Sequence, residues 1–142
     1  MAGYSGIPLV KKLGIKSGLN IAFVNAPEGF AHELDLPPAV TINSRSRKPL
    51  DFVLLFVKSE RALAVGFSQY AARLNRSGML WVAWPKKSSG VVTDLSFTNV
   101  QAIGLAGGLV DTKICAVNDV WSGLKFVFRL KDRANPGARW PK

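Results

Sequence analysis

Residues 19–30 constrain the fold of this chain more than any other stretch of its sequence. They open with an apolar run that predicts a buried strand at about residues 19–25, then a tight polar turn. A brief helix is predicted from Pro27 or Glu28 to about Leu34. A strand, a turn and a helix in this order form the opening unit of a parallel α/β sheet, so the sequence predicts an α/β architecture.

The rest of the chain continues this alternation and closes with a hairpin. The segment at residues 51–57, which is continuously apolar after Asp51, is typical of a strand that is covered on both faces in a parallel sheet. The other predicted elements are a helix at about 5–14 capped by Ser5 and closed by Gly14, a strand at 39–43, a helix from Ser59 to about Asn75 with Leu74 on its core face, a turn at Ser77-Gly78, a strand at 79–84, a helix capped by Thr93 or Asp94 and ended by Gly107-Gly108, and hairpin strands at 110–117 and 124–130.

These elements predict a single three-layer α/β sandwich with a mostly parallel sheet and a C-terminal antiparallel hairpin. We assign it to residues 1–130, and we expect residues 131–142 to form a basic, flexible tail. No apolar run approaches the roughly 20 residues that span a bilayer, and the N-terminus lacks the layout of a signal peptide. We therefore expect a cytoplasmic protein with no membrane partner.

Charge and cysteine content limit the classes of partner and site. Nineteen Lys and Arg against nine Asp and Glu give a net charge of +10, of which the tail carries +3 and the body +7. Such a field attracts nucleic acid, phosphorylated small molecules or acidic protein surfaces, although a generally solvated basic surface explains it equally well. Cys115, the single cysteine, excludes an internal disulfide and a multi-cysteine zinc site, and its mid-strand position predicts burial.

Two segments carry a resemblance to a known fold. Gly78-Met79-Leu80-Trp81-Val82 is similar to the glycine-then-strand segment of class I S-adenosylmethionine methyltransferases, and Gly108-Leu109-Val110 before a hairpin is similar to the end of that fold. The resemblance implies a Rossmann-like sheet. One strand–helix unit of the family is missing, because only a short basic loop separates Asn43 from Asp51.

The body of the chain, about residues 4–130, also resembles a small family of uncharacterised bacterial Rossmann-like proteins. That family implies no activity for this chain. The matching segments are Tyr4-Ser5-Gly6, Lys11-Lys12-Leu13-Gly14-Ile15, Asn25-Ala26-Pro27-Glu28-Gly29, Trp84-Pro85-Lys86-Lys87 and Trp121-Ser122-Gly123.

Three polar segments are expected to meet at the carboxyl edge of the parallel strands, where open α/β sheets bind ligands. They are residues 25–30, 84–90 and 118–123. The alternative is that their proline, glycine and tryptophan residues only shape tight loops and fill the rim of the core. The candidate ligand-binding residues are Asn25, Pro27, Glu28, Gly29, Trp84, Lys86, Lys87, Ser88, Trp121 and Ser122.

The same segments argue against the usual cofactor chemistry. A methyltransferase needs a glycine-rich loop after its first strand and an acidic residue ending its second, but residues 25–29 supply only Gly29 and Asn43-Ser44-Arg45 supplies no acid. The G-x-G-x-x-G loop of dinucleotide enzymes is also absent, although Arg45, Arg47 and Lys48 would suit a phosphate. His32 is expected within the first helix in a structural or surface role. No catalytic residue, metal site or cofactor is assigned.

The sequence therefore favours a non-catalytic or unorthodox binding module for a small anionic or nucleotide-like ligand. Two alternatives stay open. One is an S-adenosylmethionine-dependent methyltransferase with a degenerate cofactor loop. The other is a basic adaptor that binds nucleic acid or an acidic protein. The oligomeric state is not predicted.

Overall fold

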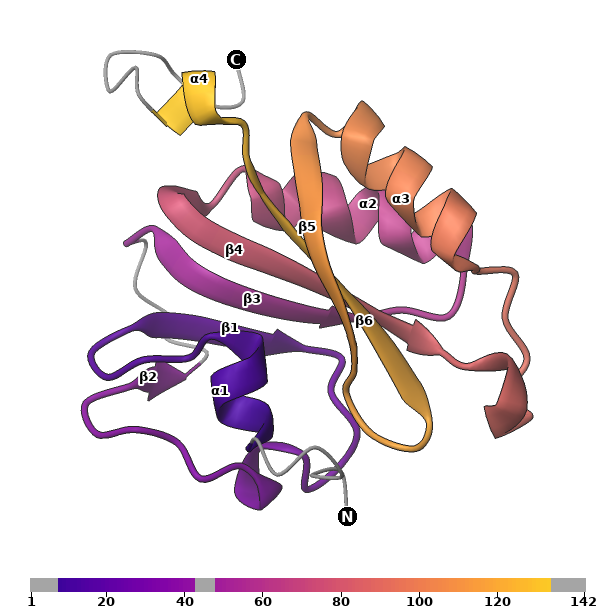
Figure 1. Ribbon diagram of the computed structural model, residues 1–142, viewed down its shortest axis with the longest axis horizontal. Coiled ribbons are helices and arrows are strands. Elements are labelled where there is room, and N and C mark those ends of the chain that lie inside the picture. The colour runs from indigo at the N-terminus through magenta and orange to yellow at the C-terminus, as the bar shows by residue number, and fades with distance from the viewer. Residues whose placement is uncertain (1–7, 43–47, 134–142) are drawn as a thin grey trace.

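A computed structural model describes residues 8–42 and 48–133, which form a twisted sheet with helices on both faces (Figure 1). Within the described residues the sheet has six strands in the order β2-β1-β3-β4-β6-β5. The strands are β1 Asn20–Val24, β2 Thr41–Ile42, β3 Leu50–Phe56, β4 Leu74–Pro85, β5 Leu109–Ala116 and β6 Trp121–Phe128; the helices are α1 Leu9–Leu13, α2 Glu60–Ala71, α3 Phe97–Ala106 and α4 Leu130–Arg133, with 3-10 turns η1 Ala31–Glu33 and η2 Lys87–Ser89.

The strand pairing confirms the predicted mixed sheet. Strand β1 pairs in parallel with β2 and β3, and β3 pairs in parallel with β4. Strand β6 then runs antiparallel between β4 and β5, which makes the closing hairpin. The fold is thus a shortened, methyltransferase-like α/β sandwich that lacks one strand–helix unit.

Side chains on the two faces of the sheet form two separate hydrophobic clusters. Leu55, Phe67 and Phe126 belong to the cluster under α2 and α3, whereas Leu13, Phe56 and Trp81 belong to the cluster under α1. Successive residues of a strand point to opposite faces, so a strand covered on both sides is apolar throughout. This explains why β3 is apolar at every position from Phe52 to Phe56.

The helix boundaries follow caps that the sequence identified only in part. Helix α2 starts where predicted, and Ser59 caps it, because its hydroxyl accepts a hydrogen bond from the Ala62 amide at 3.1 Å. The predicted cap of α3 at Thr93 or Asp94 is wrong. Ser96 caps that helix in a reciprocal box with Asn99. Asp94 instead accepts a hydrogen bond from the Glu60 amide at 2.8 Å and so helps to cap α2.

The predicted helix after the first strand is also wrong. Only the 3-10 turn η1 forms there, and Gly29 has a φ of 79° that interrupts a right-handed helix. Since Leu36-Pro37-Pro38 follows closely, a full helix has no room to extend.

Strand β4 begins earlier than predicted. Helix α2 ends at Ala71, so Leu74 opens the strand instead of lying on the helix. Ser77-Gly78, predicted as a turn, lies inside β4 next to an irregularity in its pairing with β3 between Leu50 and Phe52. A Cβ on Gly78 would come within 2.9 Å of the Asn75 carbonyl oxygen, so the tight backbone here requires glycine.

The two ends of the domain differ from the predicted elements. At the C-terminal end, α4 forms at Leu130–Arg133, where the flexible tail was predicted to begin. Helix α1 begins at Leu9 and is closed as predicted by Gly14, whose φ is 86°. The predicted Ser5 cap, the basic residues Arg45 and Arg47, and positions 134–142 lie outside the described residues. Within the described part of the chain, no helix is long and apolar enough to cross a membrane.

Candidate functional site

The loop after β1 carries four of the predicted site residues at the carboxyl edge of the sheet. Asn25 has a left-handed φ of 58°, and Gly29 has a φ of 79° with no atom within 4 Å of a Cβ placed on it. Asn25, Pro27, Glu28 and Gly29 are all exposed. The loop therefore presents open, polar backbone at the usual ligand edge.

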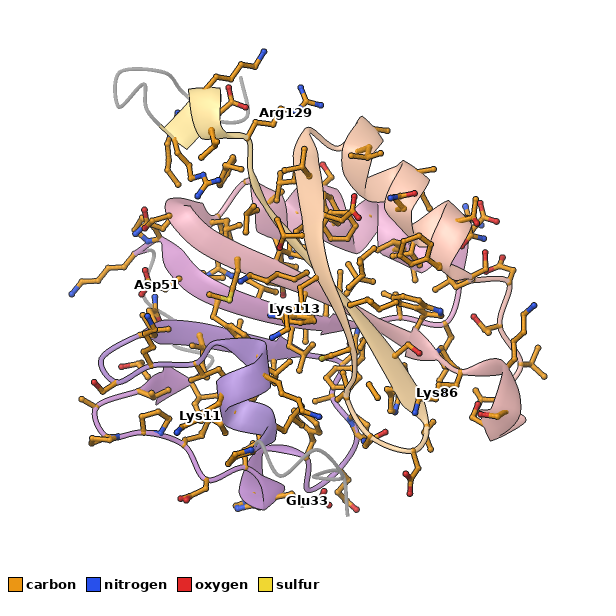
Figure 2. All side chains as sticks on the ribbon, viewed as in Figure 1. Lys11, Glu33, Asp51, Lys86, Lys113 and Arg129 are labelled. Atoms are coloured by element: carbon orange, nitrogen blue, oxygen red, sulfur yellow. The ribbon has the colours of Figure 1, made fainter. Side chains whose placement is uncertain are left out.

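The turn after β4 carries three further predicted residues and is joined to the β5–β6 hairpin. The Lys86 amide donates a hydrogen bond to the Val120 carbonyl at 2.8 Å. Within η2, the Ser89 hydroxyl donates to the Lys86 carbonyl at 2.6 Å, which holds the turn together. Lys87 and Ser88 are exposed and Lys86 is half-buried (Figure 2).

The two tryptophans predicted for this edge lie within strands and not in loops. Trp84 and Trp121 are only 5% and 8% exposed. In the β4–β6 register Trp84 is opposite Ser122 and Pro85 is opposite Trp121, so the two indoles point to opposite faces of the sheet. Trp84 packs in the cluster under α2 and α3, and Trp121 packs in the cluster under α1. Their expected convergence at one site is therefore wrong.

Trp121 instead completes a row of edge-to-face aromatic rings. Its ring centroid lies 5.0 Å from that of Phe56, which lies 5.1 Å from that of Phe30. Phe30 in turn lies 5.5 Å from Phe23. The row links the loop after β1 to the hairpin through the core and fixes both loops at the edge.

A hollow of about 550 Å³ lies beside the loop after β1, between the end of β1 and the flank of α2. Val24 and Leu55 form its floor on the sheet, and Ala62 and Val65 form its wall on the helix. Its volume lies in the range of sites that bind small molecules, and its floor and helical wall are apolar.

Polar side chains line the rim of the hollow, around its apolar floor. They come from Asn25 in the loop after β1, from Ser59 at the start of α2, and from Arg61, Gln69 and Tyr70 along the helix. These side chains offer amide, hydroxyl and guanidinium groups, which suit the polar parts of a nucleoside-like molecule.

A smaller hollow of about 320 Å³ extends the first one along β1 toward Leu50. The two share Val24, Asn25 and Tyr70. Arg73 lines the smaller hollow, and its guanidinium lies 5.8 Å from the centre of the Tyr70 ring. Together they form a groove with one arginine toward each end.

The groove has a simple cause in the topology. Helices α2 and α3 cover one face of β3, β4, β6 and β5, but in the described part of the chain no helix covers that face of β1 (Figure 1). A parallel sheet is usually covered on both faces, so the missing strand–helix unit leaves this flank open.

Sequence reasoning missed the helical side of this site. Ser59 was predicted only as the start of a helix, and Gln69 and Tyr70 were not proposed as site residues. The short link between Asn43 and Asp51 was the available signal, because a missing covering helix implies an open sheet face next to the first strand.

Other reactive groups do not line the hollow. Burial raises the pKa of the Cys115 thiol above its ordinary value of 9.0, against the opposing effect of Lys113 and Lys12. His32 is exposed on η1. Across the described ranges, no three His, Cys, Asp or Glu side chains gather closely enough to hold a metal ion.

Comparison with known proteins identifies the fold. No protein-family model and no curated protein sequence matches the chain. Solved structures do match. A fibrillarin pre-rRNA processing protein from Methanococcus jannaschii aligns with a TM-score of 0.58 at 12% identity, over 80% of this chain and 68% of that one. A fibrillarin from Aeropyrum pernix in complex with natively bound S-adenosyl-L-methionine aligns with a TM-score of 0.58 at 13% identity, over 89% and 71%.

A third match is a TehB-like S-adenosylmethionine-dependent methyltransferase from Corynebacterium glutamicum. It aligns with a TM-score of 0.56 at 8% identity and covers 85% of both chains. At such identities the likeness shows the fold alone, which is that of the class I methyltransferases.

Proposed function

We propose that this protein binds a nucleotide-like small ligand in the hollow between the end of β1 and α2, with S-adenosylmethionine or S-adenosylhomocysteine as the best-fitting class. The hollow of about 550 Å³, with its apolar floor and polar rim, carries this proposal. Its position at the carboxyl end of β1 is where open α/β sheets bind such ligands.

The residues of the hollow fit the parts of an adenosyl ligand. Val24, Leu55 and Val65 provide an apolar surface for a flat base. The side-chain amides of Asn25 and Gln69 can donate hydrogen bonds to ribose hydroxyls and accept hydrogen bonds from them. Arg61 suits the carboxylate of an amino-acid tail. No carboxylate lines the hollow among the described residues, so amides take over the role that an acidic residue has in the usual methyltransferase pattern.

Lys86 and Lys87 after β4 supply a second contact for an anionic group. Strand β3 lies between β1 and β4, so the two strand ends are about 10 Å apart at the usual strand spacing. A ligand that carries a phosphate or carboxylate beyond its nucleoside can bridge that distance to Lys86 and Lys87. Ser88 stays a predicted contact of the same kind, and Glu28 stays a predicted contact for a hydroxyl or amino group of the ligand.

Methyl transfer is the second candidate function, and it is favoured by the shared fold with S-adenosylmethionine-dependent methyltransferases. S-adenosylmethionine supplies an electrophilic methyl group when bound. In this chain the loop after β1 and the α2 wall would orient the ligand, and the apolar floor would exclude water from the base. His32 lies on η1 and does not line the hollow, so we do not assign it the role of a general base.

Calorimetric titration of S-adenosylhomocysteine into the purified protein tests the proposed site. We expect saturable binding at micromolar strength. Ala62→Trp should weaken it at least tenfold, because Ala62 lines the hollow and a tryptophan there fills it. The matched control is Ala64→Trp, an exposed position on the same helix that does not line the hollow. No heat with the unsubstituted protein, or equal loss in both variants, would contradict the site.

A further inference from the structure

A group of four lysines gathers on the α1 face of the sheet, away from the hollow. Lys113 on β5 lies directly opposite Lys125 on β6. The ammonium of Lys113 also donates a hydrogen bond to the Lys12 carbonyl at 3.2 Å, which joins the strand to the end of α1. Lys16 follows α1 and acts electrostatically on Lys125. We call Lys12, Lys16, Lys113 and Lys125 the lysine face (Lys113 is labelled in Figure 2).

An irregularity in β5 creates this arrangement. Asp111 pairs with Phe126 and Lys113 pairs with Lys125, so two steps along β5 correspond to one step along β6. The extra residue, Thr112, is a bulge that turns Asp111 and Lys113 to opposite faces. Asp111 then contacts Gln101 of α3 at 3.2 Å, while Lys113 joins the lysine face.

The positive charges of this surface are not balanced by nearby carboxylates. All nine Asp and Glu side chains lie within the described residues. The charged groups that act on Cys115 and Lys125, in the middle of the surface, are all lysines. Burial and then Lys113 and Lys16 lower the pKa of Lys125. Like charges held together without a counter-charge favour a bound polyanion.

The surface is open, and the apolar side chains beside its lysines, such as Val110 and Val127, are half-buried. Figure 1 shows α1 beside the near face of the sheet, while the near face of β5 and β6 carries no helix among the described residues. Ile114, the neighbouring exposed apolar residue, alternates to the other face. Protein–protein interface cores are rich in aromatic residues and poor in lysine, so this surface fits phosphates better than a protein partner.

We propose that the lysine face binds the phosphate backbone of double-stranded nucleic acid. A single strand would need exposed aromatic rings on which to stack. Phe97, the exposed aromatic side chain of the described residues, lies on α3 and thus on the opposite side of the sheet. Backbone contacts by lysine carry no sequence preference, so the binding is expected to tolerate any duplex sequence. This inference does not rest on the proposed ligand in the hollow.

Fluorescence anisotropy with a labelled DNA duplex of about 20 base pairs, measured over a range of salt concentrations, tests the proposal. Four phosphate contacts predict a slope of about −3.6 in a plot of log binding constant against log salt. The double variant Lys16→Gln/Lys113→Gln should make that slope shallower by about two and weaken binding roughly tenfold or more at about 0.1 M salt.

Matched controls separate the lysine face from net charge. Lys58→Gln/Lys131→Gln removes the same charge at two exposed lysines outside the lysine face and should change affinity less than about threefold. Lys16→Arg/Lys113→Arg keeps the charge and should keep the binding. Circular dichroism checks that each variant is folded.

The proposal is overturned if the duplex does not bind at low salt, or if both glutamine double variants weaken binding equally. Tighter binding of poly-L-glutamate than of the duplex would assign the surface to an acidic protein instead. Failure here would leave adenosylhomocysteine binding untouched, because the lysine face and the hollow share no residue.

Discussion

At the scale of single residues, Lys125 shows how this fold tolerates an unfavourable charge. Its side chain projects from β6 between Trp81 on β4 and Lys113 on β5 in the strand register. Burial lowers its pKa below the ordinary value of 10.5, and Lys113 and Lys16 lower it further. A charge retained in such a place costs stability, which is consistent with a role on the surface.

Replacing this lysine should therefore stabilise the protein in a pH-dependent way. Lys125→Met removes a like-charge pair across two strands and should raise the free energy of unfolding by about 0.5 kcal/mol at neutral pH. The folded state binds this proton more weakly than the unfolded state, so the unsubstituted protein gains stability as the pH rises from the lowered pKa to 10.5. The difference between the two proteins should shrink over that window.

Urea unfolding of both proteins at pH 7 and near pH 10 measures this difference. Cys115 is present in both, so its own titration cancels to first order. A stabilisation that is the same at both pH values, or a loss of stability at pH 7, would contradict the assigned cost of the charge.

At the scale of elements, the packing of α3 against the sheet depends on a close approach. A Cβ on Gly104 would lie 2.0 Å from Cε2 of Phe126, so the helix reaches β6 only because glycine occupies this position. Phe126 is fully buried and packs edge-to-face against Phe67 of α2, with ring centroids 5.2 Å apart. Because buried side chains are close-packed, such a ring has little room to move.

Gly104→Ala should therefore destabilise the protein by about 2–3 kcal/mol, although alanine is the better helix former. The matched control is Gly66→Ala inside α2, where the nearest atom, Leu55 Cδ2, would lie 3.1 Å from the new Cβ and can adjust. That variant should stay within about 1 kcal/mol of the parent. Chemical denaturation checks both, and equal stabilities would show that α3 is free to shift.

Element boundaries also show where the sequence was insufficient. Thr93, Asp94 and Ser96 are all capping residue types, and their order alone does not tell which one starts α3. The choice depends on α2, because Asp94 is already bound to the Glu60 amide. Likewise, the spacing of apolar residues fits Leu74 to the end of a helix or to the start of a strand equally well. Its pairing with Leu50 places it in β4.

At the scale of the whole molecule, the mostly parallel sheet and the closing hairpin could be predicted, because buried apolar runs and turn residues indicate them. The carboxyl edge could be predicted for the same reason. The faces on which Trp84 and Trp121 lie could not be predicted. A shift of one residue in the strand register moves a side chain to the opposite face of the sheet. The hollow could not be predicted from the periodicity of apolar residues, because it results from the absence of a covering helix beside β1 in the described part of the chain.

The central claim is that the missing strand–helix unit leaves a ligand site between β1 and α2. The most direct test is a titration of the isotopically labelled protein with S-adenosylhomocysteine, followed by amide chemical shifts in nuclear magnetic resonance spectra. We predict saturable shifts confined to residues 24–29, 55, 59–62 and 65–70, which line or adjoin the hollow, and to the proposed second contact at residues 86–88. Shifts elsewhere, or none at millimolar ligand, would contradict the claim.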